Sequence, residues 1–348
     1  MLPYFSIMAG SLTLEQFERE LPQRHLAPLW RVLAQLAPAE PMVSAVPWHW
    51  HGARLAEELR AAGQLISAAE AERRVLVLEN PGLPGQSRIT PSLYAGVQLI
   101  LPGEVARSHR HAAAALRLVL EGEGAETSVE DERIAMRPGD FIITPSWAFH
   151  GHANPGAEPV SWLDGLDVPI VSLLSATFTE PDPRPRRAAA PADGDALARF
   201  GSGLVPLDFE RRGARLPLCY YPYERTREAL EVLRKRGPWD EHRGLALAFV
   251  DPTSGGPPMP TIGTFMQLLP SGFAGARYRA TDGAVFAVLE GEGRVEFSER
   301  SWDLRPRDVF TAPPWSWYRL SATADLVLFG FSDLPLQRHL GLWREERE

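Results

Sequence analysis

The sequence predicts a mostly β protein in which two small antiparallel barrels follow an N-terminal helical segment. Short strand-like runs, separated by turns that contain Gly and Pro, dominate residues 93–174 and predict the first barrel. The motif Leu-Glu-Gly-Glu-Gly returns 169 residues later, with Glu290 in the place of Glu121, inside a longer echo of the same region. This internal repeat predicts the second barrel.

The N-terminal segment, residues 1–78, is predicted to be largely helical. Apolar residues recur at steps of three and four from 13 to 36, with a break near Pro22, which indicates two short helices. A third helical pattern covers 53–71 and ends before a strand-like run at 74–78.

The rest of the chain divides by composition and pattern. The first barrel is predicted over 79–178, a linker and helix over 179–244, the second barrel over 245–335 and a C-terminal helix over 336–348. The linker begins with a stretch rich in Pro, Ala and Arg, and its helix is expected near 223–236. The two Glu-Gly-Glu-Gly segments lie between strands and lack a following Lys-Ser/Thr, so they predict hairpin turns and not phosphate loops.

Three histidines in the first barrel are spaced as metal ligands. His109 and His111 are two residues apart on a strand-like run, so both imidazoles point to the same face. His150 follows a Pro-Gly turn and a returning strand, which supplies a third ligand from a neighbouring strand. In the second copy of the repeat the corresponding residues are Tyr278, Ala280 and Tyr318. The sequence therefore predicts one metal site, in the first barrel.

A second His-x-His, at His49 and His51, has no third partner in a barrel context, and we interpret it as structural packing.

Charge and composition exclude several function classes. The net charge of −8 and the absence of a Lys/Arg run disfavour a nucleic-acid partner. A single cysteine, Cys219, allows no intramolecular disulfide and no cysteine-based zinc site, and it indicates a reducing, cytoplasmic location. Neither a signal peptide nor an apolar run of about 18 residues is evident, so secretion and membrane insertion are not expected.

These spacings resemble the cupin motifs, which here are formed by Gly103, His109, His111, Gly139, Pro145, His150 and Asn154. Within the cupins the chain resembles gentisate 1,2-dioxygenases, a family that includes salicylate and 1-hydroxy-2-naphthoate dioxygenases. The segments that carry this resemblance are 93–100, 109–117, 144–150, 162–167, 260–263, 331–333 and 341–347.

The resemblance implies a bicupin, usually a homotetramer, with Fe(II) held by His109, His111 and His150. It also implies a substrate site formed by Gln98, Arg117, His152, Asp164, Tyr94 and Trp147. Arg117 lies six residues after His111, so strand parity places it on the ligand side, where its guanidinium suits a substrate carboxylate.

Roles for the other polar residues follow from their chemistry. Gln98 can hydrogen-bond the substrate hydroxyl or dioxygen, and His152 can assist proton movement. Asp164 can orient one of these side chains.

The implied reaction opens the ring of a 2-hydroxybenzoate with dioxygen, between the carbons that bear the carboxylate and the hydroxyl. Gentisate, salicylate, a 5-substituted salicylate and 1-hydroxy-2-naphthoate all remain open as substrates. Two other hypotheses are a cupin that binds an aromatic acid without turning it over and a metal-dependent sugar-phosphate isomerase. The isomerase would usually need a carboxylate ligand soon after the His-x-His, and none precedes Glu121.

Two departures from the family pattern bear on the substrate. Many gentisate dioxygenases carry an acidic residue where this chain has Gly151, and polar residues where it has Ala112, Ala113 and Ala114. If these alanines face the substrate, the pocket is larger and less polar.

Overall fold

The computed structural model describes residues 13–130, 132–184, 194–207, 209–210 and 216–348. The chain forms two compact units, one ending at Met42 and one beginning at Val43. The described part of the first unit consists of α1 (Leu14–Glu20), the 3-10 helix η1 (Leu21–Arg24) and α2 (Leu29–Leu36). Thr13 caps α1 through a capping box with Gln16, and the break at Pro22 falls in η1, so the two predicted short helices are confirmed.

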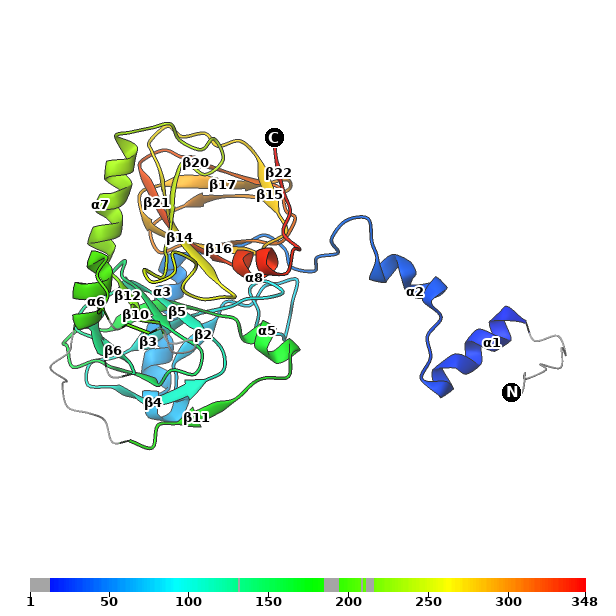
Figure 1. The fold of residues 1–348 in the computed structure, drawn as a ribbon, viewed down its shortest axis with the longest axis horizontal. Coiled ribbons are helices and arrows are strands. Elements are labelled where there is room, and N and C mark those ends of the chain that lie inside the picture. Colours follow the sequence, from blue (N-terminus) through cyan, green and yellow to red (C-terminus); the bar gives the residue numbers. More distant parts are fainter. Residues whose placement is uncertain (1–12, 131, 185–193, 208, 211–215) are drawn as a thin grey trace. The chain divides into compact units, whose positions relative to one another are not determined.

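The second unit contains both barrels, each made of two antiparallel sheets (Figure 1). In the first barrel one sheet has the order β12-β8-β5-β10-β3-β2 and the other β11-β4-β9-β6-β7. These strands are β2 (Val75–Val77), β3 (Tyr94–Ile100), β4 (Val105–His111), β5 (Ala115–Glu121), β6 (Glu126–Val129), β7 (Glu132–Ala135), β8 (Phe141–Thr144), β9 (His150–Ala153), β10 (Val160–Leu166), β11 (Thr179–Pro181) and β12 (Tyr220–Tyr221).

In the second barrel the sheet orders are β1-β19-β16-β21-β14-β13 and β18-β17-β20-β15-β22. Its strands are β1 (Trp48–Trp50), β13 (Leu245–Ala248), β14 (Gly263–Leu269), β15 (Tyr278–Ala280), β16 (Ala284–Glu290), β17 (Gly293–Phe297), β18 (Ser301–Leu304), β19 (Val309–Ala312), β20 (Tyr318–Ala322), β21 (Leu326–Ser332) and β22 (Glu345–Arg347). The predicted mostly β fold with two barrels is confirmed.

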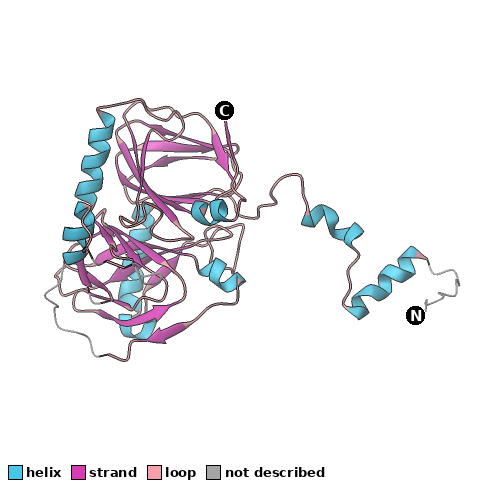
Figure 2. Cartoon of the chain, in the orientation of Figure 1, coloured by secondary structure: helices cyan, strands magenta, loops and turns pink. Residues whose placement is uncertain are grey.

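The helices of this unit lie outside the sheets, as Figure 2 shows. Helix α7 runs along both barrels, because Tyr223 at its start donates to Asp140 of the first barrel and Arg234 at its end pairs with Asp325 of the second. The helices are α3 (Gly52–Leu65), α4 (Ala68–Ala71), α5 (Val168–Leu173), α6 (Asp195–Arg199), the 3-10 helix η2 (Phe200–Ser202), α7 (Tyr223–Arg234) and α8 (Leu334–His339). No helix among the described residues is long and apolar enough to span a membrane.

Two predicted segments need correction. In the segment 1–78, of which 1–12 lies outside the described residues, β1 was not predicted and joins a sheet of the second barrel. Strand β2 lies in the strand-like run predicted at 74–78 and joins a sheet of the first barrel. The C-terminal helix predicted over 336–348 ends at His339, where Gly341 takes a positive φ of 70° and the chain turns into β22. The first part of the predicted linker is only partly covered, since 185–193 lies outside the described residues.

One apolar core joins the two barrels. Phe141 of β8 lies 5.2 Å from Phe329 of β21 and 4.6 Å from Phe249, measured between ring centroids. All three rings are buried. Because the barrels share this core, the second barrel supports the strands that carry the histidines of the first.

Candidate metal centre and active-site cavity

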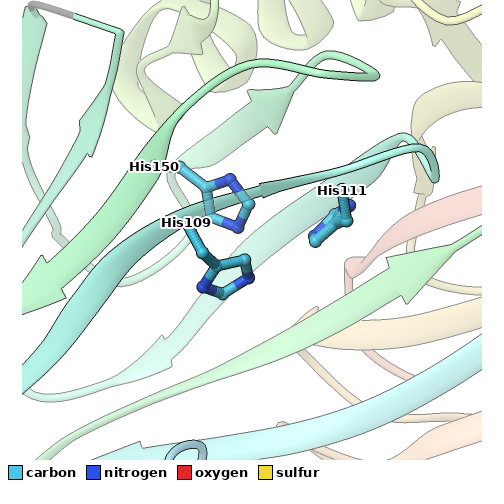
Figure 3. Close-up of side chains that lie close together, drawn as sticks. All are labelled: His109, His111 and His150. Carbon is cyan, nitrogen blue, oxygen red and sulfur yellow. The ribbon is translucent and has the colours of Figure 1, made fainter. Parts of the chain in front are cut away.

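The three predicted histidines converge in the first barrel (Figure 3). His109 and His111 lie at the end of β4, and His150 begins β9, where it pairs in register with His109. The ring of His150 is 4.5 Å from that of His109 and 4.8 Å from that of His111, between centroids. One nitrogen from each ring lies within 4.8 Å of the others. The parity of β4 and its pairing with β9 therefore create one three-nitrogen site.

Hydrogen bonds orient two of these rings for metal binding. Nδ1 of His111 lies 2.7 Å from the carbonyl oxygen of Ala113, and Nδ1 of His150 lies 3.0 Å from that of Ala148. A carbonyl only accepts, so both Nδ1 atoms donate, which leaves each Nε2 with a free lone pair. Burial lowers the pKa of both imidazoles below the ordinary range. The two rings are therefore neutral at pH 7, as metal ligands must be.

The third ring has a cationic neighbour. Arg73, just before β2, places one guanidinium nitrogen 2.5 Å from Nδ1 of His109 and 2.8 Å from the carbonyl oxygen of Arg107. Burial, followed by the positive charge of Arg73, lowers the pKa of His109 to about 4. A guanidinium only donates, so Nδ1 of His109 accepts this hydrogen bond from Arg73.

A cavity of about 340 Å³ opens beside the histidines. Its lining combines ionisable side chains with apolar ones, which suits a flat aromatic acid. It is lined by Arg73, Val75, Gln86, Ser87, Arg88, Tyr94, Gln98, His109, His111, Ala115, Arg117, His150, His152, Asp164, Leu166, Val168, Pro169 and Ser172.

Arg117 lies at the inner wall of this cavity. It is 4% exposed and donates to the hydroxyl of Thr144. Its Nε lies 3.4 Å from Oδ1 of Asp164, which is directly opposite on β10, but makes no hydrogen bond. Burial raises the pKa of Asp164 to about 6, although the charge of Arg117 and a hydrogen bond from the Trp162 indole oppose that rise. Arg117 is therefore a buried cation with hydrogen-bonding capacity left for a ligand.

Gln98, Tyr94 and His152 complete the polar side of the cavity. Gln98 is buried on β3, and burial raises the pKa of Tyr94, four residues earlier, so its hydroxyl stays protonated. His152 packs on the ring of Trp162 at 5.0 Å, and neither of its ring nitrogens has a hydrogen-bond partner. Burial lowers the pKa of His152, so this imidazole is neutral and has both nitrogens available.

Comparisons with known proteins identify the family of the chain. Residues 96–167 match the family described as "Cupin domain". Over 333 residues the chain is 46% identical to gentisate 1,2 dioxygenase 1 of Aquipseudomonas alcaligenes, covering 96% of each protein. The chain belongs to the gentisate 1,2-dioxygenase family.

Two further relatives show the breadth of this family. A crystal structure of the salicylate 1,2-dioxygenase of Pseudaminobacter salicylatoxidans superposes with a TM-score of 0.90 at 33% identity, over 96% of this chain and 97% of that one. The 5-aminosalicylate 1,2-dioxygenase of Comamonas sp. is 32% identical over 96% of this chain and 90% of its own length. The predicted bicupin fold and the predicted class, a ring-cleaving dioxygenase, are confirmed.

Trp147 does not belong with the residues that line the cavity. It lies in the turn between β8 and β9 with a positive φ of 66°, and it is 37% exposed. The guanidinium carbon of Arg110 lies 4.7 Å from the centroid of the Trp147 ring. The centroids of the Trp147 and Phe178 rings are 6.4 Å apart. Trp147 therefore does not line this cavity, and the substrate contact predicted for it stays a prediction.

The two departures from the family pattern also lie outside the cavity. Ala112, Ala113 and Ala114 are absent from its lining, so the condition under which they would enlarge the pocket is not met. They form the bend after β4, where Ala114 donates its N–H to Asp167. A Cβ on Gly151 would meet the backbone of Ser108 at 3.2 Å, so this position faces the neighbouring strand β4.

Sequence reasoning missed Arg73, a half-buried cation that lines the cavity with Arg117. It lies before the short strand β2, outside the region where histidine spacing drew attention. Its pKa is lowered to about 10, first by burial and then by the charge of Arg117. Two guanidinium groups that repel one another in one cavity indicate a site for an anion.

The second barrel has a different interior where the first has its histidines. The ring centroids of Tyr278 and Tyr318 lie 6.0 Å apart, and Arg243 donates to the Tyr278 hydroxyl at 2.5 Å. Gln267, which pairs with Gln98 in the repeat, donates to the backbone of Arg243 and does not line the cavity. A part-exposed cation, Arg243, thus contacts the tyrosine that stands where the first barrel has His109.

Proposed function

We propose that the chain is an Fe(II)-dependent dioxygenase that opens the ring of gentisate or a related 2-hydroxybenzoate. One observation carries this proposal: three neutral imidazoles, the buried guanidinium of Arg117 and the half-buried guanidinium of Arg73 line the same cavity. The imidazoles suit a divalent metal, and the guanidinium groups suit an anionic substrate. Gentisate stands first among the substrates because the relative with 46% identity is a gentisate enzyme.

The donor set fits iron. His109, His111 and His150 would hold the ion, and because they are neutral they would leave its 2+ charge to attract an anionic substrate. Zinc also accepts imidazoles but is redox-inert, so it cannot serve an oxidation by dioxygen. An Fe(II) ion held by His109, His111 and His150 would supply the redox chemistry of an oxidation by dioxygen.

Arg117 and Arg73 orient the substrate. A 2-hydroxybenzoate carries its carboxylate and hydroxyl on adjacent carbons, and Arg117 donates to the carboxylate from the inner wall. Asp164 opposite fixes the Arg117 side chain, and Arg73, just before β2, contributes a second guanidinium. The apolar side of the cavity, with Val75 and Leu166, contacts the ring.

Neutral groups on the polar side of the cavity are placed to accept and donate protons. His152 has both nitrogens unpartnered and can take the proton that the substrate hydroxyl releases on binding. Gln98 and the Tyr94 hydroxyl donate hydrogen bonds toward oxygen atoms of the reactants. In the balanced reaction the bond between the two substituted ring carbons breaks and each carbon takes one oxygen atom, so no other reductant is needed.

The substrate is tested by dioxygen uptake of anaerobically Fe(II)-loaded enzyme. The panel is gentisate, salicylate, 5-substituted salicylates and 1-hydroxy-2-naphthoate, with the ring-opened product followed by absorbance. We expect the highest kcat/KM with gentisate and no uptake by the His111→Ala variant. Binding of these acids without uptake would instead support a non-catalytic aromatic-acid cupin. We also propose a homotetramer, on family membership alone, which light scattering of the purified protein tests.

A further inference from the structure

A second group of metal-ligating side chains lies outside the cavity. His49 on β1 and His51 just after it are two residues apart, and Asp308 immediately precedes β19, the strand that pairs with β1. One ligand atom from each of the three lies within 4.8 Å of the others. The sequence predicted only packing for this His-x-His, because its carboxylate partner is distant in the chain and is brought near by the pairing of β1 with β19.

His49 is incompletely satisfied in this position. It is 6% exposed, and its Nε2 lies 2.9 Å from Oδ2 of Asp308. Its Nδ1 is buried and has no hydrogen-bond partner. Leaving a buried ring nitrogen without a partner costs free energy, so a single contact with Asp308 does not account fully for a histidine here.

The other two groups are placed to share a cation with it. The His51 ring lies 4.3 Å from the His49 ring, nearly perpendicular to it, and is exposed to solvent. Oδ1 of Asp308 accepts from Gly52 N–H at 2.8 Å, and Oδ2 accepts from Arg305 N–H at 3.0 Å. Burial alone would raise the pKa of Asp308, but the hydrogen bonds from His49, Gly52 and Arg305 hold it below its ordinary value. The carboxylate is therefore ionised and rigidly held.

We propose that His49, His51 and Asp308 bind a divalent cation of the zinc or nickel class, which fastens β1 to the second barrel. Two imidazoles and one carboxylate are a donor set that these ions accept, and the exposed side at His51 leaves room for water as a further ligand. None of the three residues lines the catalytic cavity, so the role of the ion is structural.

The test counts zinc ions in the untagged full-length protein by equilibrium dialysis and elemental analysis. The catalytic histidines also accept zinc, so the set is wild type, His51→Gln, His111→Ala and the double variant. We expect two zinc ions per chain in wild type, one in each single variant and none in the double variant. His25→Gln, which removes another exposed histidine, serves as the matched control and should retain both ions.

A second measurement separates a built site from zinc held by any exposed histidine. In the His111→Ala background, saturating zinc should raise the melting temperature, because an ion bound to the folded state stabilises it. His51→Gln should abolish this rise, and His25→Gln should preserve it. The proposal is overturned if His51→Gln binds as much zinc as wild type. It is also overturned if zinc raises the melting temperature of His111→Ala equally with and without the His51→Gln substitution.

Discussion

The substitution Arg117→Met isolates the buried cation at the inner wall of the cavity. Methionine fills much of the volume of arginine but removes the guanidinium that is proposed to hold the substrate carboxylate. A hydrogen bond to a charged group contributes about 1.5–3 kcal/mol, and about 1.4 kcal/mol corresponds to a tenfold change. We therefore expect kcat/KM for the preferred acid to fall roughly 10- to 150-fold.

The same substitution changes the protonation state of the Asp164 carboxyl. This carboxyl has a pKa near 6 while Arg117 lies 3.4 Å away, and burial already favours its protonated form. Without the cation its pKa rises further, so Asp164 takes up a proton at neutral pH and is not left as an unpaired buried charge. Folding stability then changes much less than activity does.

The assay for Arg117→Met combines steady-state dioxygen uptake with urea denaturation and iron analysis. Arg117→Lys is the matched control, since it keeps the charge and loses the planar fork, and it should recover part of the loss. If Arg117→Met keeps kcat/KM within about twofold of wild type while binding iron normally, Arg117 does not anchor the carboxylate.

Three further predictions concern metal, substrate and core. Burial and Arg73 lower the pKa of His109 to about 4, so protons compete weakly for the metal ligands. Fe(II) affinity should therefore hold down to roughly pH 5. A loss of Fe(II) affinity centred near pH 6.5 in a metal titration would contradict this. Arg73→Met should raise the KM for the substrate about tenfold, and it should raise the pKa of His109 because it removes a neighbouring cation. An unchanged KM in the uptake assay would exclude a contact between Arg73 and the substrate. Phe141→Ala removes the ring between the barrels and should lower the free energy of unfolding by about 3–5 kcal/mol in urea denaturation, whereas a change below about 1 kcal/mol would show that the barrels do not depend on this contact.

Sequence reasoning reached those features that strand periodicity governs. Alternation along one strand places His109 and His111 together, and the same parity carried forward to Arg117 across the bend. The turn and returning strand before His150 were visible as a Pro-Gly pair and an apolar run. These residues lie within 42 positions of one another, where spacing constrains direction.

The features that sequence reasoning missed depend on non-local pairing or on turn geometry. Trp147 sits at a positive φ, where strand parity gives no direction. Arg73 reaches the cavity because β2 pairs with β3, and β1 joins the second barrel by pairing with β19. The approach of His49 to Asp308 follows from that second pairing, which no spacing along the chain indicates.

The most direct test of the proposed function is the stoichiometry of dioxygen and substrate in Fe(II)-loaded enzyme. With gentisate, the proposed reaction predicts one dioxygen consumed for each ring-opened product formed, and no consumption after the iron is removed or in His111→Ala. Consumption of dioxygen without ring opening, or ring opening that persists without iron, would contradict it.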